Sequence, residues 1–212
     1  MVKYKKKGAD GMNKIITIGR EFGSGGRELG RMLAQELGYE YYDKEIITEI
    51  SKRTELSEKF VQQVIENDPH SLYPITIGHT FAYVHSHGIE RQQAIFREQC
   101  EVLKSMAEKS DCVIVGRCAD YILKGYQPYK IFVYADMDSK LERCKKRSDV
   151  QEHFTDKQLK RHIKQVDRNR AKYYRFFTGL EWGDKLNYDI CLNTTNADME
   201  KVVKSISKLF KD

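Results

Sequence analysis

The feature that most constrains this chain is an apolar run that breaks into a glycine-rich turn and then continues as a helix. Residues 15–18 read Ile-Ile-Thr-Ile, residues 23–26 read Gly-Ser-Gly-Gly, and apolar residues then recur at helical spacing from Leu29 to Leu37. A strand, a glycine loop and a helix in this order direct backbone N–H groups and a helix N-terminus toward one point. The sequence therefore predicts a phosphate-binding loop, with a tight turn that binds no ligand as the alternative.

Strand and helix patterns alternate along the rest of the chain. We expect strands at 14–18, 40–42, 112–115, 129–135 and 188–192. We expect helices at 26–37, 43–51, 89–109, 117–123, 139–147, 155–177 and 197–210, with one more beginning at Ser57. Asp43 would be the N-cap of the helix that runs to about Ser51. This alternation is typical of an α/β three-layer sandwich, in which helices cover both faces of a parallel sheet of about five strands. We predict a single domain over residues 13–212, preceded by a disordered basic extension at 1–12.

Two polar turns follow predicted buried strands. Gly116-Arg117 ends the strand at 112–115, and Ala135-Asp136 ends the strand at 129–135. Ligands of parallel sheets bind at the carboxyl ends of the strands, so both turns should lie beside the glycine loop. Arg117 could donate two parallel hydrogen bonds to a phosphate there, or it could form a surface ion pair.

Positive charge is concentrated in one segment. Residues 140–175 hold thirteen lysines and arginines against five acidic residues, although the whole chain has a net charge of only +6. If this segment folds over the glycine loop, its basic side chains would neutralise charge on a transferring phosphoryl group. A solvated helix face is the plain alternative, and a nucleic-acid surface is a weaker one.

Composition narrows the class of protein further. No apolar run approaches the roughly 18 residues that span a membrane. The five cysteines are scattered and form no Cys-x-x-Cys pair, which disfavours a zinc site or a disulfide framework. We expect a cytoplasmic protein with no membrane partner.

On these residues the chain resembles the cytidylate-kinase-like family of the nucleoside monophosphate kinase group of P-loop proteins. The resemblance covers residues 15–43, Val113–Arg117, Ile131–Arg143, Asp167–Arg170 and Tyr188–Thr195, and it is poor over residues 44–110. It implies a kinase that transfers the γ-phosphoryl group of ATP, with Mg²⁺, to a small acceptor such as CMP. It also implies an acceptor-binding helical insertion at 44–110 and an arginine-rich lid at about 140–175.

The expected site residues come partly from the resemblance and partly from residues that could compensate for positions the chain lacks. The catalytic residues would be Arg27, Arg117, Arg168 and Arg170. The nucleotide-binding residues would be Arg20, Gly23, Ser24, Gly25, Gly26, Arg27 and Glu28. The metal ligands would be Glu28 and Asp120.

The chain departs from the family pattern where the chemistry is performed. Gly26 stands at the position of the P-loop lysine and Glu28 at that of the following serine or threonine. Val115 and Cys118 stand where acidic residues are expected. Arg20 or Arg27 could replace the lysine, and Glu28, Asp120 or Asp136 the metal ligands. A nucleotide- or phosphate-binding protein that has lost catalysis is therefore the main alternative to a kinase.

Other features carry less specific expectations. Residues 67–87 are expected to form an irregular segment, in which His79, His85 and His87 could make loop contacts or contact a second substrate. Trp182 could stack on a base, although a packing role is the more ordinary one. The helix at 89–109 could form a homodimer face. A nucleotide or another phosphate-bearing small molecule is the expected partner, and nucleic acid is not.

Overall fold

The five predicted strands form one parallel sheet. The computed structural model describes residues 12–66, 81–146 and 154–211, with side chains for these ranges except 81–89. Within them the strand order is β2-β3-β1-β4-β5, and every neighbouring pair runs parallel. The strands are β1 (Ile15–Arg20), β2 (Glu40–Tyr42), β3 (Cys112–Val115), β4 (Tyr129–Tyr134) and β5 (Ile190–Asn193). This confirms the predicted α/β class.

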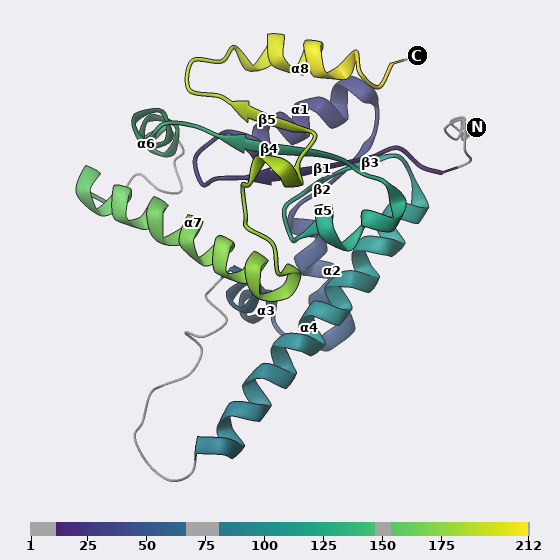
Figure 1. Cartoon of the computed structure of the whole chain (residues 1–212), viewed down its shortest axis with the longest axis vertical. Helices are drawn as coiled ribbons and strands as arrows, with labels where there is room; N and C mark the ends of the chain where they lie inside the picture. Colours follow the sequence, from purple (N-terminus) through teal and green to yellow (C-terminus); the bar gives the residue numbers. More distant parts are fainter. Residues whose placement is uncertain (1–11, 67–80, 147–153, 212) are drawn as a thin grey trace.

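Helices cover both faces of the sheet, as expected. Figure 1 shows α1 and α8 on one side of it and α2, α3, α4, α5 and α7 on the other. The described helices are α1 (Gly26–Leu37), α2 (Lys44–Thr54), α3 (Glu58–Glu66), α4 (Phe81–Lys109), α5 (Ala119–Ile122), α6 (Met137–Lys145), α7 (Asp156–Thr178) and α8 (Met199–Ser207). No described helix has the length and apolar character needed to cross a bilayer.

Alternation along the strands builds a separate core on each face. Ile16 and Ile18 of β1 point into a core with Leu29 and Leu33 of α1, and this core extends to α8. Ile15, one residue away, points into the opposite core, which α2, α3, α4 and α5 complete. Successive strand side chains point to opposite faces, so the apolar run at 15–18 supplies both cores.

Glycines set both ends of α1. Gly25 precedes the helix with φ 83° and Gly38 ends it with φ 67°. The N–H of Gly38 donates to the carbonyls of Ala34 and Gln35. Both φ values lie in the left-handed region that favours glycine. The predicted boundaries of this helix are confirmed.

Three predicted boundaries need correction. Residues 81–87 were expected in an irregular segment, but α4 begins at Phe81 and is helical through them. Residues 67–80, including His79, lie outside the described part of the chain. The helix expected at 117–123 is only α5, because Arg117 and Cys118 have φ values of 60° and 53°. The last strand begins at Ile190, since Lys185–Asn187 form a short 3₁₀ turn before it.

Candidate functional site

The glycine loop between β1 and α1 is fixed from several sides. Gly23 and Gly25 have φ values of 76° and 83°. The buried Thr194 hydroxyl donates to the Ser24 carbonyl at 2.6 Å, and the Ser24 hydroxyl donates to the Glu21 carbonyl at 2.9 Å. The N–H groups at the start of α1 have no intrahelical partners and carry the positive end of the helix dipole. The loop therefore offers backbone donors of the kind that bind anions at helix N-termini.

Arg20 crosses the floor of this loop. It ends β1 and is buried, and a Cβ added at Gly26 would overlap the Cβ of Arg20. A Cβ added at Gly116 would overlap the Arg20 guanidinium. Glycine at both positions therefore gives Arg20 the space to reach from β1 across to the end of β3.

The turn after β3 holds an unusual backbone. Gly116, Arg117 and Cys118 follow one another with φ values of 73°, 60° and 53°. A non-glycine residue in this region costs of order 1–3 kcal/mol and persists where the surrounding structure imposes it. The buried Gln99 of α4 contributes to that restraint by donating to the Arg117 carbonyl at 2.8 Å. The strained turn places Arg117 at the carboxyl edge of the sheet.

Four arginines converge at this edge: Arg20, Arg27, Arg117 and Arg170. Burial lowers the pKa of Arg20 well below its ordinary value, and the charges of Arg170, Arg117 and Arg27 lower it further against the opposing effect of Asp43. Burial also lowers the pKa of Arg170, which Asp167 and Glu66 raise and Arg117 and Arg27 lower. The Arg170 guanidinium donates to the Arg20 carbonyl at 3.2 Å. We call these four residues the arginine cluster.

Acidic side chains only partly balance the arginine cluster. Asp43 lies 2.8 Å from Arg27 and 3.7 Å from Arg20, and Glu66 lies 2.9 Å from Arg117. The Nε atoms of Arg20 and Arg117 are buried and have no hydrogen-bond partner among the described residues. Burial alone would raise the pKa of Glu66, but Arg117 and other partners bring it below its ordinary value. With Asp167 at 3.8 Å from Arg170, three carboxylates face four arginines, and the excess positive charge suits a further anion.

The Asp43 side chain does not cap α2, contrary to expectation. Asp43 stands at the N-cap position of α2, as predicted, but its side chain makes no cap hydrogen bond. Its carboxylate turns to Arg27 and Arg20 instead, and the Glu45 side chain accepts from the Asp43 N–H at 3.0 Å. Asp43 directly follows β2 at the carboxyl edge of the sheet. That position could have indicated from the sequence that its side chain belongs to the site.

The structure separates some predicted site residues from the cluster. Arg168 and Glu28 are exposed. Asp120 is buried and accepts from the Tyr174 hydroxyl at 2.6 Å, and Asp136 caps α6 by accepting from Ser139 N–H. No three His, Cys, Asp or Glu residues of the described chain gather where they could hold a metal ion. The assignment of Glu28 and Asp120 as metal ligands stays a prediction.

The hollow at the glycine loop is small. A cavity of about 30 Å³ lies there, lined by Arg20, Phe22, Arg27 and Arg170 together with the loop itself. Pockets that hold small molecules are typically several hundred Å³. With Arg27 and Arg170 in these positions, the cavity is far smaller than such a pocket.

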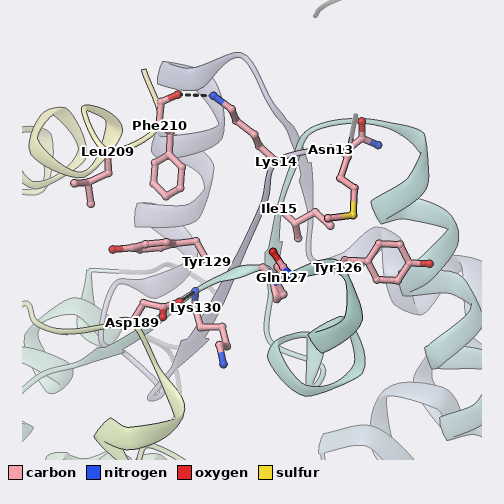
Figure 2. A pocket seen from close by; sticks show the side chains of 12 residues that line it. Asn13, Lys14, Ile15, Tyr126, Gln127, Tyr129, Lys130, Asp189, Leu209 and Phe210 are labelled. Atoms are coloured by element: carbon pink, nitrogen blue, oxygen red, sulfur yellow. Dashed lines mark hydrogen bonds between the residues drawn. The ribbon is translucent and has the colours of Figure 1, made fainter. Parts of the chain in front are cut away.

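A larger hollow lies at the other end of the strands. Its volume is about 540 Å³, and Figure 2 shows Tyr126, Tyr129, Phe210 and Lys14 around it, with Lys14 donating to the Phe210 carbonyl. It adjoins the amino ends of β1 and β4. Parallel sheets bind their ligands at the carboxyl ends, so the glycine loop and arginine cluster remain the candidate site.

Trp182 and the outer face of α4 have structural explanations. Trp182 meets the Phe132 ring edge-on with centroids 5.2 Å apart, which is a packing contact. Over residues 90–109 the exposed positions of α4 include Arg91, Arg97, Glu101 and Glu108. That polar face provides no apolar surface for the expected homodimer, which stays a prediction.

The sequence is similar to a known protein family and to a named relative. The model of the cytidylate kinase-like family matches residues 15–196. A protein named cytidylate kinase from Methanopyrus kandleri is 25% identical over 193 residues, covering 85% of this chain and 84% of that protein.

Solved structures share the architecture. An uncharacterized protein from Eubacterium ventriosum has a TM-score of 0.64 and 26% identity, covering 93% of this chain and 98% of its own. A shikimate kinase from Bacteroides thetaiotaomicron has a TM-score of 0.55 and 17% identity with the same coverages. A sugar kinase from Janibacter sp. has a TM-score of 0.54 and 13% identity, covering 93% and 94%. The likeness to the two kinases shows a shared fold.

Proposed function

The chain belongs to the cytidylate kinase-like family, and on that premise we propose that it transfers the γ-phosphoryl group of ATP to a small phosphate-bearing acceptor such as CMP. The family and the fold support a kinase. The observation that carries the finer proposal is the arginine cluster. Arg20, Arg27 and Arg170 line the cavity at the glycine loop, and the charge of Arg117 lies near enough to lower the pKa of Arg20 and Arg170. Phosphoryl transfer depends mainly on positioning and on stabilising charge, and such a cluster supplies both.

The donor phosphates would lie on the glycine loop. The backbone of Gly23–Gly26 and the first N–H groups of α1 provide donors, and Arg27 stands at the same helix end. Arg20 supplies the positive charge that the family's lysine would bring. In this proposal the replacement of that lysine by Gly26 is what allows Arg20 to approach, because the two side chains compete for one space.

The acceptor phosphate would be held at the end of β3. The strained turn fixes Arg117 there. Arg117 would exchange its ion pair with Glu66 for contacts to the acceptor phosphate. Arg170 reaches the loop from α7 and would stabilise the developing charge. Arg168 is exposed and would act only if the α6–α7 region closes as a lid over the site. Buried and half-buried side chains within residues 44–110 would shape the acceptor site.

The family also implies a metal ion, which ATP-dependent kinases use to neutralise phosphate charge. Mg²⁺ in such sites is held largely by the substrate phosphates with one or two carboxylates. Glu28 is exposed and Asp120 accepts from the Tyr174 hydroxyl, so neither carboxylate has a contact that marks it as the ligand. We therefore derive no step through the metal and assign it no ligand.

A binding protein without catalysis is the second candidate function. The substitutions at Gly26, Glu28, Val115 and Cys118 favour it, as does the pairing of Arg27 and Arg117 with the protein's own carboxylates. It predicts nucleotide binding without metal dependence and no turnover with any acceptor. Detectable phosphoryl transfer that is lost on mutating Arg27 would exclude it.

The decisive experiment combines a binding screen with turnover. Nucleoside mono-, di- and triphosphates are tested by thermal shift with and without Mg²⁺, and every stabilising acceptor is then assayed with ATP. We expect stabilisation by ATP and turnover of at least one monophosphate. Arg117→Ala should reduce turnover about 100-fold or more, because a charge-assisted contact to the reacting group is lost.

Arg97→Ala provides the matched control, since Arg97 is an exposed arginine on α4. That variant should keep wild-type turnover. If Arg117→Ala turns over the acceptor as fast as the Arg97 control, the assignment of Arg117 is wrong.

A further inference from the structure

The phosphate-binding loop contains an acidic residue that needs an explanation. Glu21 lies between Arg20 and the glycines and lines the small cavity at the loop. A carboxylate there would repel an incoming phosphate, because charges in a partly buried site are screened less than in water. An anion site can keep such a residue only if its charge is cancelled or its carboxylate is held aside.

Lys140 meets both requirements. It lies on α6, its side chain is 6% exposed, and its ammonium is 2.6 Å from the Glu21 carboxylate. The same carboxylate accepts from the Ala135 N–H at 3.3 Å, so two contacts draw it toward the start of α6. The space at Gly23 also depends on this helix, because a Cβ there would lie 3.0 Å from the Lys140 carbonyl.

The same ammonium connects the loop to α7. Lys140 donates to Asp167 at 3.1 Å, and Asp167 accepts from the Phe22 N–H at 2.6 Å. Burial raises the pKa of Asp167, while the Phe22 N–H and Lys140 oppose that effect. One buried lysine therefore holds Glu21 of the loop and the residue that binds the loop's backbone.

We infer that Lys140 is a positioning residue that cancels the charge of Glu21 and ties the glycine loop to α6 and α7, so that the loop accepts phosphate. This inference rests on the proposed function for its effect on nucleotide binding. It assigns Lys140 no contact with the substrate. Its ammonium acts through Glu21 and Asp167.

The test is a charge-compensation experiment on the full chain. Lys140→Met should weaken binding of ATP and of inorganic tripolyphosphate, measured by calorimetry, by about tenfold or more, since Glu21 is left uncompensated. Lys140→Met combined with Glu21→Gln should restore most of that loss, and Lys140→Arg should stay within about threefold of wild type. If Lys140→Met binds tripolyphosphate like wild type, or if Glu21→Gln restores nothing, the inference is overturned.

Lys145→Met is the matched control. Lys145 also lies on α6 and pairs with Asp156 of α7 at 2.7 Å, but both side chains are more than half exposed and lie off the loop. The Lys145→Met variant should bind tripolyphosphate with the affinity of the wild-type protein. A purely structural role for Lys140 would lower thermal stability and leave the affinity of the folded protein unchanged, which would also overturn the inference.

A second measurement separates this inference from the proposed function. In the ligand-free protein, amide exchange of the peptide containing Phe22 should accelerate about tenfold or more in Lys140→Met and not in Lys145→Met. If the wild-type protein binds no nucleotide or tripolyphosphate, the proposed function fails, and the exchange measurement still tests the positioning role. Equal exchange in both variants would refute that role.

Discussion

At the residue scale, the site depends as much on absent side chains as on present ones. Gly26 and Gly116 leave the space that the Arg20 side chain fills. The backbone of Gly26 is not in the left-handed region, so its conformation does not require glycine. The close approach of the Arg20 side chain explains why this position has no Cβ. The glycine at position 26 is thus explained by the placement of the Arg20 side chain.

Replacing that glycine should be costly. In Gly26→Ala the new methyl would overlap the Arg20 Cβ, which cannot rotate away, so the backbone must shift. We expect a loss of about 1–3 kcal/mol in the free energy of unfolding, measured by urea denaturation, with weaker ATP binding. Gly125→Ala is the control, because nothing lies within 4 Å of a Cβ there. Equal stability of the two variants would show that the crowding at Gly26 is unimportant.

At the element scale, the short helix α5 is fastened to α7 by a buried carboxylate. Asp120 accepts from the Tyr174 hydroxyl at 2.6 Å. Burial raises the pKa of Asp120 despite this hydrogen bond. The contact joins the element after Arg117 to the helix that carries Arg170, so it fixes how two members of the arginine cluster face each other.

The raised pKa predicts a pH dependence. Folding favours protonated Asp120, so its contribution to stability is complete below the unfolded pKa of about 3.9 and is lost as pH rises through the folded pKa. Asp120→Asn should therefore be more stable than wild type at pH 7, with the advantage vanishing near pH 3. Urea denaturation of both proteins between about pH 3 and pH 7 measures this difference in stability.

The control for this prediction is Asp198→Asn. A hydrogen bond from the Lys201 N–H lowers the pKa of Asp198, so its contribution has the opposite sign and the variant should gain nothing at pH 7. If Asp120→Asn instead removed the Mg²⁺ dependence of turnover, Asp120 would be a metal ligand and not a fastening residue.

At the scale of the whole molecule, positive charge is displayed on one helix. The exposed basic residues of α7 are Lys157, Lys160, Arg161, Lys164, Arg168, Lys172 and Arg175. The same helix brings Arg170 to the glycine loop from its other side. A basic surface beside the site should attract polyphosphates by long-range steering, without specific contacts.

Charge reversal tests this steering. Changing Lys157, Arg161 and Lys164 to glutamate should slow ATP association by about tenfold at low salt, with dissociation unchanged, and the effect should disappear at high salt. Stopped-flow binding measures both rates. The same changes at Lys201, Lys204 and Lys208, in or next to α8 on the opposite face of the sheet, should have a smaller effect. Equal slowing by the α7 and α8 changes would indicate that net charge alone sets the association rate. Tight DNA binding that is lost when the α7 charges are reversed would favour a nucleic-acid surface.

Local patterns predicted most of the fold. The apolar residues at 15–18 and 112–115, and the glycines at 25 and 38, act on their own neighbours, so periodicity and backbone preference were sufficient. Errors arose where a local signal had a distant competitor. Asp43 reads as a helix cap, but two arginines held by the tertiary fold attract its carboxylate more strongly.

The sequence by itself determined the strand and helix segments, the glycine loop and the placement of Arg20 and Arg117 at strand ends, because these follow from patterns among near neighbours in the chain. Only the tertiary structure decided which charges meet. Lys140 with Glu21, Asp167 with Phe22, and Arg117 with Glu66 join residues 51 or more positions apart. A buried ion pair depends on distance and desolvation, which the folded chain alone establishes.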